Sequence, residues 1–407
     1  MTGSPHRLRR RRRLRLCSTS APPLDDDDLL TEFLLRLPPK PSSLPRASAV
    51  SKRWRGIVSD PGFLRRFRLR HRRDAPILGY FRTDLQRIRI SFVPTLEAPD
   101  LVPAERFSLQ LGESDAYGFR PLSCRHGLVL MHLRYWTELL VWDCVTGDQH
   151  RLSVPRGFAR EQLRIDASVL RAARVVHNFQ VVLVGFHKED RKRAIACVYS
   201  SETGLWGNLV STLLPDEPNF MGVLAVLVGD SIYWYIAGGS SRILRFDLHR
   251  QMLTVIPVPV TKMEDRCQIM ILRTEGGGLG FLVKSGCKVQ LWKRETGCDG
   301  VASWALGRTI ELDELLHLDP EEKESLSIIA YAEYSNVVFL LTVIGHFTVQ
   351  LESLKFKKIF DTEIYCLNQP FECVYTGGNT MPCIDGTTKP ETGIGGARGG
   401  ADLLHNS

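Results

Sequence analysis

The chain has 407 residues, of which 43% are hydrophobic and 24% are charged, a balance typical of a globular protein with more than one domain. No apolar run approaches the roughly 20 residues that span a bilayer. We expect no secretory signal either, because no apolar segment follows the charged start of the chain. None of the ten cysteines forms a Cys-x-x-Cys pair, so we expect reduced thiols rather than a zinc site or a disulfide framework.

The net charge of +8 is unevenly distributed. Residues 1–16 hold seven arginines and no acidic residue, and residues 46–73 hold ten Lys or Arg and one Asp, so the remainder carries a net charge of −8. The basic character therefore belongs to the start of the chain and does not indicate that the main body binds nucleic acid.

Both ends of the chain read as disordered. Residues 1–23 form an Arg-rich leader in which Arg9–Arg13 fits a nuclear localisation signal, while the acid-free start also fits an organellar transit peptide. The third possibility is that the leader is a solvated tail with no targeting signal. Residues 377–407 contain eight glycines and no aromatic residue, which predicts a disordered tail.

Residues 24–70 predict a small helical domain of about three helices. Asp25–Asp28 can cap the first helix, and Pro38 and Pro39 end it. A second helix begins at Ser42 or Ser43, and Asp60–Gly62 break it before a third. The apolar stripe of the first helix consists of Leu29, Leu30, Phe33, Leu34 and Leu37. So small a domain with so much apolar surface is expected to need a partner.

Residues 74–376 predict a large all-β domain, since short strands alternate with turns and no long amphipathic helix recurs between them. The predicted strands are Ala75–Phe81, Gly127–His132, Leu139–Asp143, Val181–Phe186, Ala194–Ser200, Ser231–Ile236, Ile243–Leu248, Gly280–Val283, Val289–Lys293, Val337–Val343 and Phe347–Leu351.

A degenerate repeat runs through this domain, consisting of an apolar strand and a polar turn that often contains Thr-Gly. Its equivalent points are Asp143, Glu202, Asp247 and Lys293, separated by 59, 45 and 46 residues. A four-stranded propeller blade takes about 40–50 residues, so the domain has room for roughly six or seven blades. We therefore predict a β-propeller, with a sandwich-like repeat array as the alternative.

Three segments resemble the F-box motif in order and spacing. They are Leu24-Asp-Asp-Asp-Asp-Leu-Leu-Thr-Glu-Phe-Leu-Leu-Arg-Leu-Pro-Pro39, Arg46-Ala-Ser-Ala-Val-Ser-Lys-Arg-Trp-Arg55 and Asp60-Pro-Gly-Phe63. Asp25 stands where the family usually has Pro, and Ser51 where it usually has Cys.

The large β domain carries a second resemblance. Cys124–Leu130, Val141–Asp148 and Val198–Gly207 are similar to the β domain of a large plant F-box group.

The resemblance implies a non-catalytic adaptor in the nucleus and/or cytoplasm. The F-box would bind a Skp1-like adaptor and, through it, a cullin ubiquitin ligase, while the β domain would bind the target protein. The residues expected at the Skp1 contact are Leu24, Leu29, Leu30, Leu34, Leu37, Pro38, Val50, Lys52, Trp54 and Ile57. For Trp54, a place in the module's own core is as good an expectation as a place in the interface.

Other patterns favour structural roles. Gly276–Gly280 lacks the Lys-Ser/Thr of a phosphate loop and is expected to join two strands. Cys124 and His126 are expected in a turn, since no second pair lies at metal-ligand spacing. The arginines of residues 65–73 are expected on a solvated face or against an acidic partner.

We expect no cofactor. Two alternative functions are an enzyme built on a propeller and a nucleic-acid-associated protein that uses the Arg-rich runs.

Overall fold

The computed structural model describes residues 26–84, 89–112, 115, 119–133, 137–158, 165–171, 178–187, 189–218, 220–221, 225–259, 267–298, 300–319, 326–360 and 368–376. The Arg-rich leader, Leu24, Asp25 and the Gly-rich tail lie outside the described residues.

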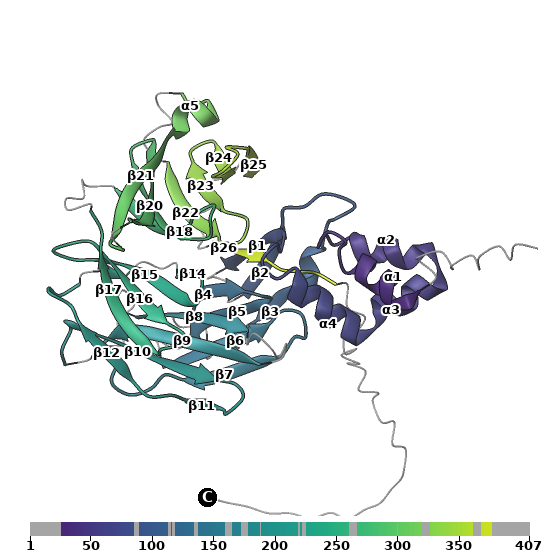
Figure 1. The fold of residues 1–407 in the computed structure, drawn as a ribbon, viewed down its shortest axis with the longest axis horizontal. Helices are drawn as coiled ribbons and strands as arrows, with labels where there is room; N and C mark the ends of the chain where they lie inside the picture. Colours follow the sequence, from purple (N-terminus) through teal and green to yellow (C-terminus); the bar gives the residue numbers. More distant parts are fainter. Residues whose placement is uncertain are drawn as a thin grey trace, which may run out of the picture. The chain divides into compact units, whose positions relative to one another are not determined.

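The N-terminal part forms four helices rather than about three, and we call residues 26–73 the helical module. The helices are α1 (Asp27–Leu34), α2 (Ser43–Val50), α3 (Lys52–Ser59) and α4 (Pro61–Arg70) (Figure 1). The expected second helix is broken at Ser51, whose backbone is extended and whose hydroxyl accepts a hydrogen bond from the Trp54 N–H at 3.1 Å. Serine is a favoured N-cap, so the residue that departs from the motif starts α3.

Two aspartates start the first and last helices of the module. Asp26 caps α1 by accepting from the N–H groups of Asp28 and Leu29 at 2.8 and 3.3 Å. Asp60 caps α4 in the same way through the Phe63 N–H at 2.7 Å. In the described part of the chain, no helix has the length and apolarity that crossing a membrane would require.

The rest of the described chain is a six-bladed β-propeller, which confirms the prediction of a propeller and fixes its blade count. Each blade is an antiparallel sheet of four or five strands. Blade 1 contains β26 (Asn368–Glu372), β1 (Ile77–Asp84), β2 (Arg89–Pro94) and β3 (Ser108–Gln110), and a short 3-10 helix, η2 (Ala104–Arg106), precedes β3. Blade 2 contains β4 (Arg120–Arg125), β5 (Leu128–Leu133), β6 (Glu138–Asp143) and β7 (Gln149–Ser153). Blade 3 contains β8 (Ile165–Arg171), β9 (Phe179–Phe186), β10 (Arg193–Ser200), β11 (Leu205–Trp206) and β12 (Val210–Leu213).

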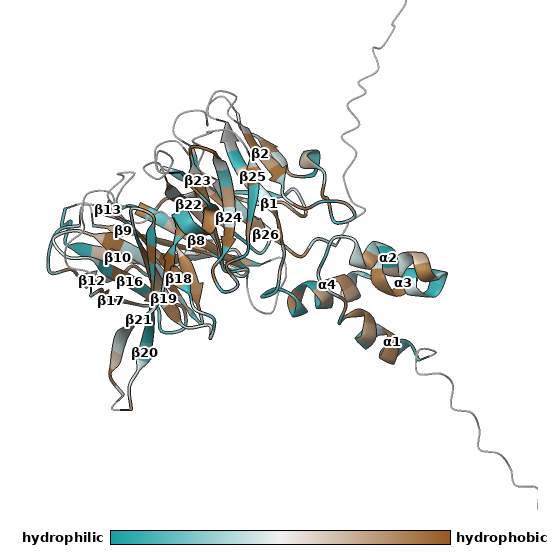
Figure 2. Ribbon diagram, turned by 90° about the horizontal axis from the view of Figure 1, so that it is seen from above, coloured by the Kyte–Doolittle hydropathy of each residue, from teal (hydrophilic) through white to brown (hydrophobic). Residues whose placement is uncertain are grey.

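The remaining blades follow in chain order. Blade 4 contains β13 (Phe220–Met221), β14 (Val226–Val228), β15 (Ser231–Ala237), β16 (Arg242–Asp247) and β17 (Met252–Pro257). Blade 5 contains β18 (Gln268–Arg273), β19 (Leu279–Ser285), β20 (Lys288–Thr296) and β21 (Ala302–Glu311), and α5 (Leu312–Leu316) follows it. Blade 6 contains β22 (Ser327–Ala332), β23 (Val337–Thr342), β24 (Gly345–Gln350) and β25 (Phe356–Phe360). In Figure 2 the β20–β21 hairpin projects beyond the neighbouring strands.

The ring is closed by pairing its last strand with its first. β26 runs antiparallel to β1, with Tyr80 opposite Pro370 and Phe81 opposite Gln369. β26 also contacts β22 of blade 6 and β4 of blade 2, so the innermost strands meet around the ring. Closure removes the open sheet edges that would otherwise pair with other chains.

The core lies in layers between neighbouring blades. Along β5, Val129 and Met131 pack toward blade 1, while Leu128 and Leu130 pack toward blade 3, and all four are fully buried. Because successive side chains point to opposite faces, a strand between two neighbours is apolar at almost every position.

All eleven predicted strands coincide with observed ones, and two of the predicted turns are also confirmed. Gly276–Gly280 lies at the β18–β19 hairpin, where the Thr274 N–H donates to the Gly278 carbonyl at 2.9 Å. The repeated phrase marks the turn after the third strand of a blade. There the carboxylates of Asp143 and Asp247 each accept from the backbone N–H groups two and three residues later.

Candidate protein-docking site

The first helix divides its apolar residues between two faces. Leu30 and Leu34 are completely buried in the core of the helical module, where they pack with Phe63 and Phe67. Leu29 is 54% exposed and Phe33 47% exposed on the other side. The expectation that Leu30 and Leu34 lie on a docking face therefore differs from the structure, in which they face inward. Phe33, which is not among the residues expected at the contact, faces outward instead. Its spacing of four residues from Leu29 is the feature of the sequence that places both side chains on one face of the helix.

The outward side of the module is completed by α2 and α3. Val50 at the end of α2 is 61% exposed, and the Phe33 ring meets the half-buried Trp54 ring with centroids 6.1 Å apart. Trp54 also packs against the module's core, as do the half-buried Leu37 and Ile57. Pro38 and Lys52 are exposed. The structure thus confirms the expected core contact of Trp54, while its place in an interface stays a prediction.

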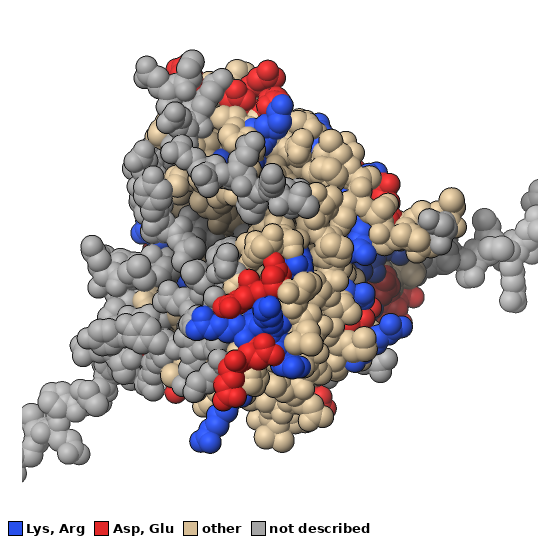
Figure 3. Space-filling model, turned by 90° about the vertical axis from the view of Figure 1, so that its left-hand side faces the viewer, with Lys and Arg blue, Asp and Glu red and all other residues tan. Residues whose placement is uncertain are grey.

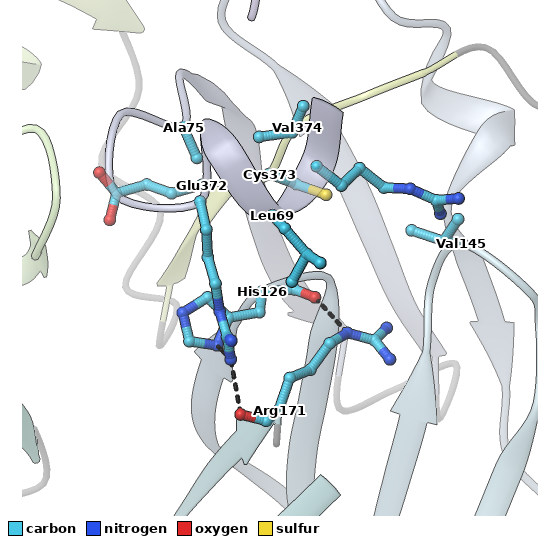
Figure 4. A pocket seen from close by; sticks show the side chains of 10 residues that line it. Leu69, Ala75, His126, Val145, Arg171, Glu372, Cys373 and Val374 are labelled. Carbon is cyan, nitrogen blue, oxygen red and sulfur yellow. Dashed lines mark hydrogen bonds between the residues drawn. The ribbon is translucent and has the colours of Figure 1, made fainter. Parts of the chain in front are cut away.

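The end of α4 is held against the propeller through arginine side chains. Arg72, two residues after the end of α4, donates from one terminal nitrogen to His126 Nδ1 at 2.8 Å and to the Arg171 carbonyl at 2.6 Å. Arg68 and Arg72 both line a cavity of about 60 Å³ between α4 and the propeller, shown in Figure 4. The expectation of a solvated arginine face is wrong for Arg68 and Arg72, because both are partly buried by this contact.

His126 is a neutral hydrogen-bond relay at this junction. Burial, followed by the charges of Arg72, Arg125 and Arg171, holds the pKa of His126 well below its ordinary value. Arginine can only donate, so Nδ1 accepts and the proton resides on Nε2, which donates to the Tyr334 hydroxyl at 2.7 Å. His126 and Gly127 have φ of 54° and 77° in the β4–β5 turn, which confirms the turn expected for His126. Cys124, expected in the same turn, lies in strand β4 instead, paired with Val129.

A second polar contact joins the module to blade 1. The Asp100 carboxylate, on the segment between β2 and β3, accepts from the Ser42 N–H at the start of α2 at 3.0 Å. Apolar contacts accompany it, since Ala75 before β1 and Val374 after β26 belong to the core of the helical module.

The centre of the propeller is closed by one arginine. Arg125, at the end of β4, donates to the Glu333 carboxylate of blade 6 at 2.6 Å. It also bonds to Ser123 of blade 2, Ser168 of blade 3 and the Ala225 carbonyl next to blade 4. The cavity beside these groups measures about 30 Å³, enough for about two water molecules.

Other buried titratable groups near the centre also make structural bonds. Glu372 accepts from the N–H groups of Tyr334 and Ser335 at 3.0 and 2.7 Å, and burial raises its pKa to about 7. Over the described residues, no three His, Cys, Asp or Glu side chains come together in a way that could hold a metal ion.

The charged surface of the propeller is mixed in sign. On the face shown in Figure 3, acidic and basic side chains lie next to one another rather than in separate patches. Ion pairs on the propeller include Arg242 with Asp216 and Arg193 with Asp190. A mixed surface gives little of the one-signed field that draws in nucleic acid.

Known proteins resemble the chain in both parts. A model of the F-box domain matches residues 26–66, and a model described as "F-box protein AT5G49610-like, beta-propeller" matches residues 122–372, more than half of the chain. The F-box protein At5g07610 of Arabidopsis thaliana is 26% identical over 343 residues, covering 79% of this chain and 78% of that protein. The F-box/kelch-repeat protein At2g43445 of the same plant is 24% identical over 337 residues, covering 77% and 73%.

Among solved structures, the β-propeller domain of Cps50 (Swd1) from Myceliophteria thermophila aligns with a TM-score of 0.38 and 12% identity, covering 70% of this chain and 86% of that one.

Proposed function

Because the chain belongs to the family of F-box proteins with an At5g49610-like propeller, we propose that it is the substrate-recognition subunit of a Skp1–cullin–F-box ubiquitin ligase. The helical module docks on a Skp1-like adaptor, and the propeller binds the target protein. The chain itself is a non-catalytic adaptor in this proposal.

One observation carries the docking half of the proposal. The core of the module is filled around Leu30 and Leu34, with Ala75 and Val374 contributing from outside the module, yet Leu29, Phe33 and Val50 remain exposed. Apolar side chains that folding does not require, placed beside a half-buried tryptophan, are typical of the centre of a helix-mediated interface.

The geometry of the ring supports a place for the target protein. The helical module contacts the end of the propeller at which β4 and β8 finish. Strands in a blade are antiparallel, so the turns between second and third strands lie at the other end. They include residues 238–241, 286–287 and 343–344. We propose that the target binds there, on loops carried by a rigid scaffold.

The centre of the propeller leaves little room for a small substrate beside Arg125. Arg125 joins groups from four blades at that point and leaves a cavity of only about 30 Å³. A pocket for a small substrate usually measures about 300 Å³ or more.

Co-precipitation with a Skp1-like adaptor tests the proposal. In the full chain, Leu29→Asp with Phe33→Asp places two charges on the exposed face of α1 and leaves its buried face intact. We expect this double variant to lose Skp1, since a charge buried without a partner is strongly unfavourable.

Leu205→Asp is the matched control, because Leu205 is an exposed leucine on the propeller, 68% accessible, and the change should leave binding unaltered. Full Skp1 binding by the double variant would refute the docking face. A fluorescent fusion of the full chain tests the further proposal that the protein works in the nucleus or cytoplasm.

A further inference from the structure

The helical module is joined to the propeller at two polar points that lie far apart in the sequence. We infer that Arg72 and Asp100 are positioning residues, which together fix the orientation of the docking helices relative to the propeller. The consequence for ubiquitin transfer rests on the proposed function, whereas the orientation itself can be measured on the free chain.

Arg72 is suited to this role because one of its nitrogens serves two blades. It donates to His126 Nδ1 of blade 2 and to the Arg171 carbonyl of blade 3, at 2.8 and 2.6 Å. His126 then passes the connection to the Tyr334 hydroxyl of blade 6 at 2.7 Å. A rotation of α4 would break this chain of bonds at its first link, and charge-assisted hydrogen bonds are among the strongest in proteins.

The acceptors that Arg72 meets are themselves held in place. Arg171 donates through Nε to the His126 carbonyl at 2.8 Å, and through a terminal nitrogen to the Asp143 carboxylate at 2.6 Å. The bond from Arg171 to the His126 carbonyl is drawn in Figure 4. His126 also lies in a two-residue turn with little freedom. The propeller therefore presents a fixed receptor for the Arg72 side chain.

Asp100 holds the module at its other end. Its carboxylate accepts from the Ser42 N–H where α2 starts, a place where the helix dipole favours a negative charge. The segment that carries Asp100 is tied to the propeller, because Glu97 pairs with Lys357 of β25 at 2.6 Å. Two separated points of attachment restrict rotation in a way that one point cannot.

Neither residue belongs to the exposed face that we assign to Skp1. Loss of both should therefore leave Skp1 affinity unchanged and alter where the propeller lies relative to the bound adaptor. In a ligase, that relation decides which lysines come within reach of the activated ubiquitin.

The first experiment measures distances in the full, free chain. Probes are introduced at the exposed Ser59 and Ser303 as genetically encoded non-natural amino acids, which leaves the native cysteines untouched. We expect one narrow distance distribution for the unaltered chain and a broad or shifted one for Arg72→Met with Asp100→Ala. The matched controls are Arg73→Met, the exposed neighbouring arginine, and Glu105→Ala, an exposed acidic residue on the same segment as Asp100; both should keep the narrow distribution.

A narrow, unshifted distribution in the double variant would overturn the inference. If the double variant does not fold, Asp100→Ala alone and Tyr334→Phe decide instead, since each removes a single polar contact, and each should broaden the distribution to a smaller extent.

The second experiment separates the inference from the proposed function. In a reconstituted ligase, the lysines of the chain that become self-ubiquitinated are mapped by mass spectrometry. We expect the double variant to bind Skp1 as the unaltered chain does and to be modified over a wider set of lysines. An unaltered chain that fails to bind Skp1 refutes the proposed function, while the distance measurement still decides the inference. An unchanged lysine pattern beside a broadened distance distribution would overturn the consequence for ubiquitin transfer.

Discussion

Phe33 of α1 meets Trp54 of α3 edge to face, with ring centroids 6.1 Å apart and an interplanar angle of 62°. The two residues differ in what they contribute. Phe33 is 47% exposed, while Trp54 also packs on the core of the helical module.

Phe33→Ala should therefore act mainly on docking. We expect the free energy of unfolding to fall by about 1 kcal/mol, the value of an aromatic pair. Skp1 affinity should fall by about 2 kcal/mol or more, which is roughly 30-fold, as for an interface hot spot. Trp54→Ala should lower both quantities, and Trp54→Phe should restore most of the stability. Calorimetric unfolding and a Skp1 titration check the two values; equal effects of Phe33→Ala and Trp54→Ala on stability would contradict the assignment.

Leu34→Ala should act through folding. Leu34 is fully buried, and removing such a side chain costs roughly 2–5 kcal/mol. We expect faster hydrogen exchange throughout α1–α4, unchanged exchange in β5 and β9, and weaker Skp1 binding as a secondary result. Leu29→Ala is the control, because Leu29 is exposed on the same helix and should leave exchange unaltered. Slow exchange in α1 of Leu34→Ala would show that Leu34 is not a core residue.

Asp166 should make the propeller less stable as the pH rises. Burial raises its pKa from 3.8 to about 7, and its carboxylate accepts from Trp234 Nε1 at 3.1 Å. Between these two values the folded chain binds more protons than the unfolded chain, so stability falls as the pH increases from about 4 to about 7. Asp166→Asn should reduce the loss of Tm between pH 5 and pH 8. Because the pKa of Glu372 is also about 7, part of the decrease of Tm with rising pH should remain in Asp166→Asn.

The control for this measurement is Asp230→Asn, because the Asp230 side chain is 73% exposed. The Tm of Asp230→Asn should equal that of the unaltered chain at every pH. A slope in Asp166→Asn as steep as that of the unaltered chain would mean that Asp166 is ionised in the folded protein.

The closing strand should be essential for solubility. Phe371 of β26 is fully buried, and its ring lies 4.9 Å from that of Phe81 and 5.0 Å from that of Phe107. A chain that ends after residue 367 loses this contact and exposes the edge of β1, so we expect it to aggregate in size-exclusion chromatography. A chain that ends after residue 376 should elute as a monodisperse species. Equal behaviour of the two would argue against closure by β26.

The strands predicted from the sequence are all central strands of the blades, for a physical reason. β5 and β9 are buried on both faces and read as continuous apolar runs. The innermost strands carry buried polar groups such as Ser123, Ser168 and Gln369, which break that pattern. The outermost strands are largely exposed, as in β7. β26 also contains Pro370, which argues against a strand when the chain is read locally.

The placement of the candidate site residues was predicted in part. The apolar stripe correctly predicted the helix α1, but it is wide enough to cover two faces, and only packing against Phe63 and Phe67 decides that Leu30 and Leu34 are the inward pair. The contacts of Arg72 and Arg125 could not be predicted, because their partners lie up to 208 residues away in the chain. Such pairs depend on ring closure rather than on any local pattern.

Val374 has a consequence for the order of events during synthesis. It follows the last strand of the propeller, yet it belongs to the core of the helical module at the opposite end of the chain. At about 5–20 residues per second, roughly 15–60 s separate the emergence of α4 from that of Val374 at the ribosome. The helices of the module therefore acquire their last core residue only when the ring can close, so a nascent chain whose propeller is unfinished carries an incomplete helical module.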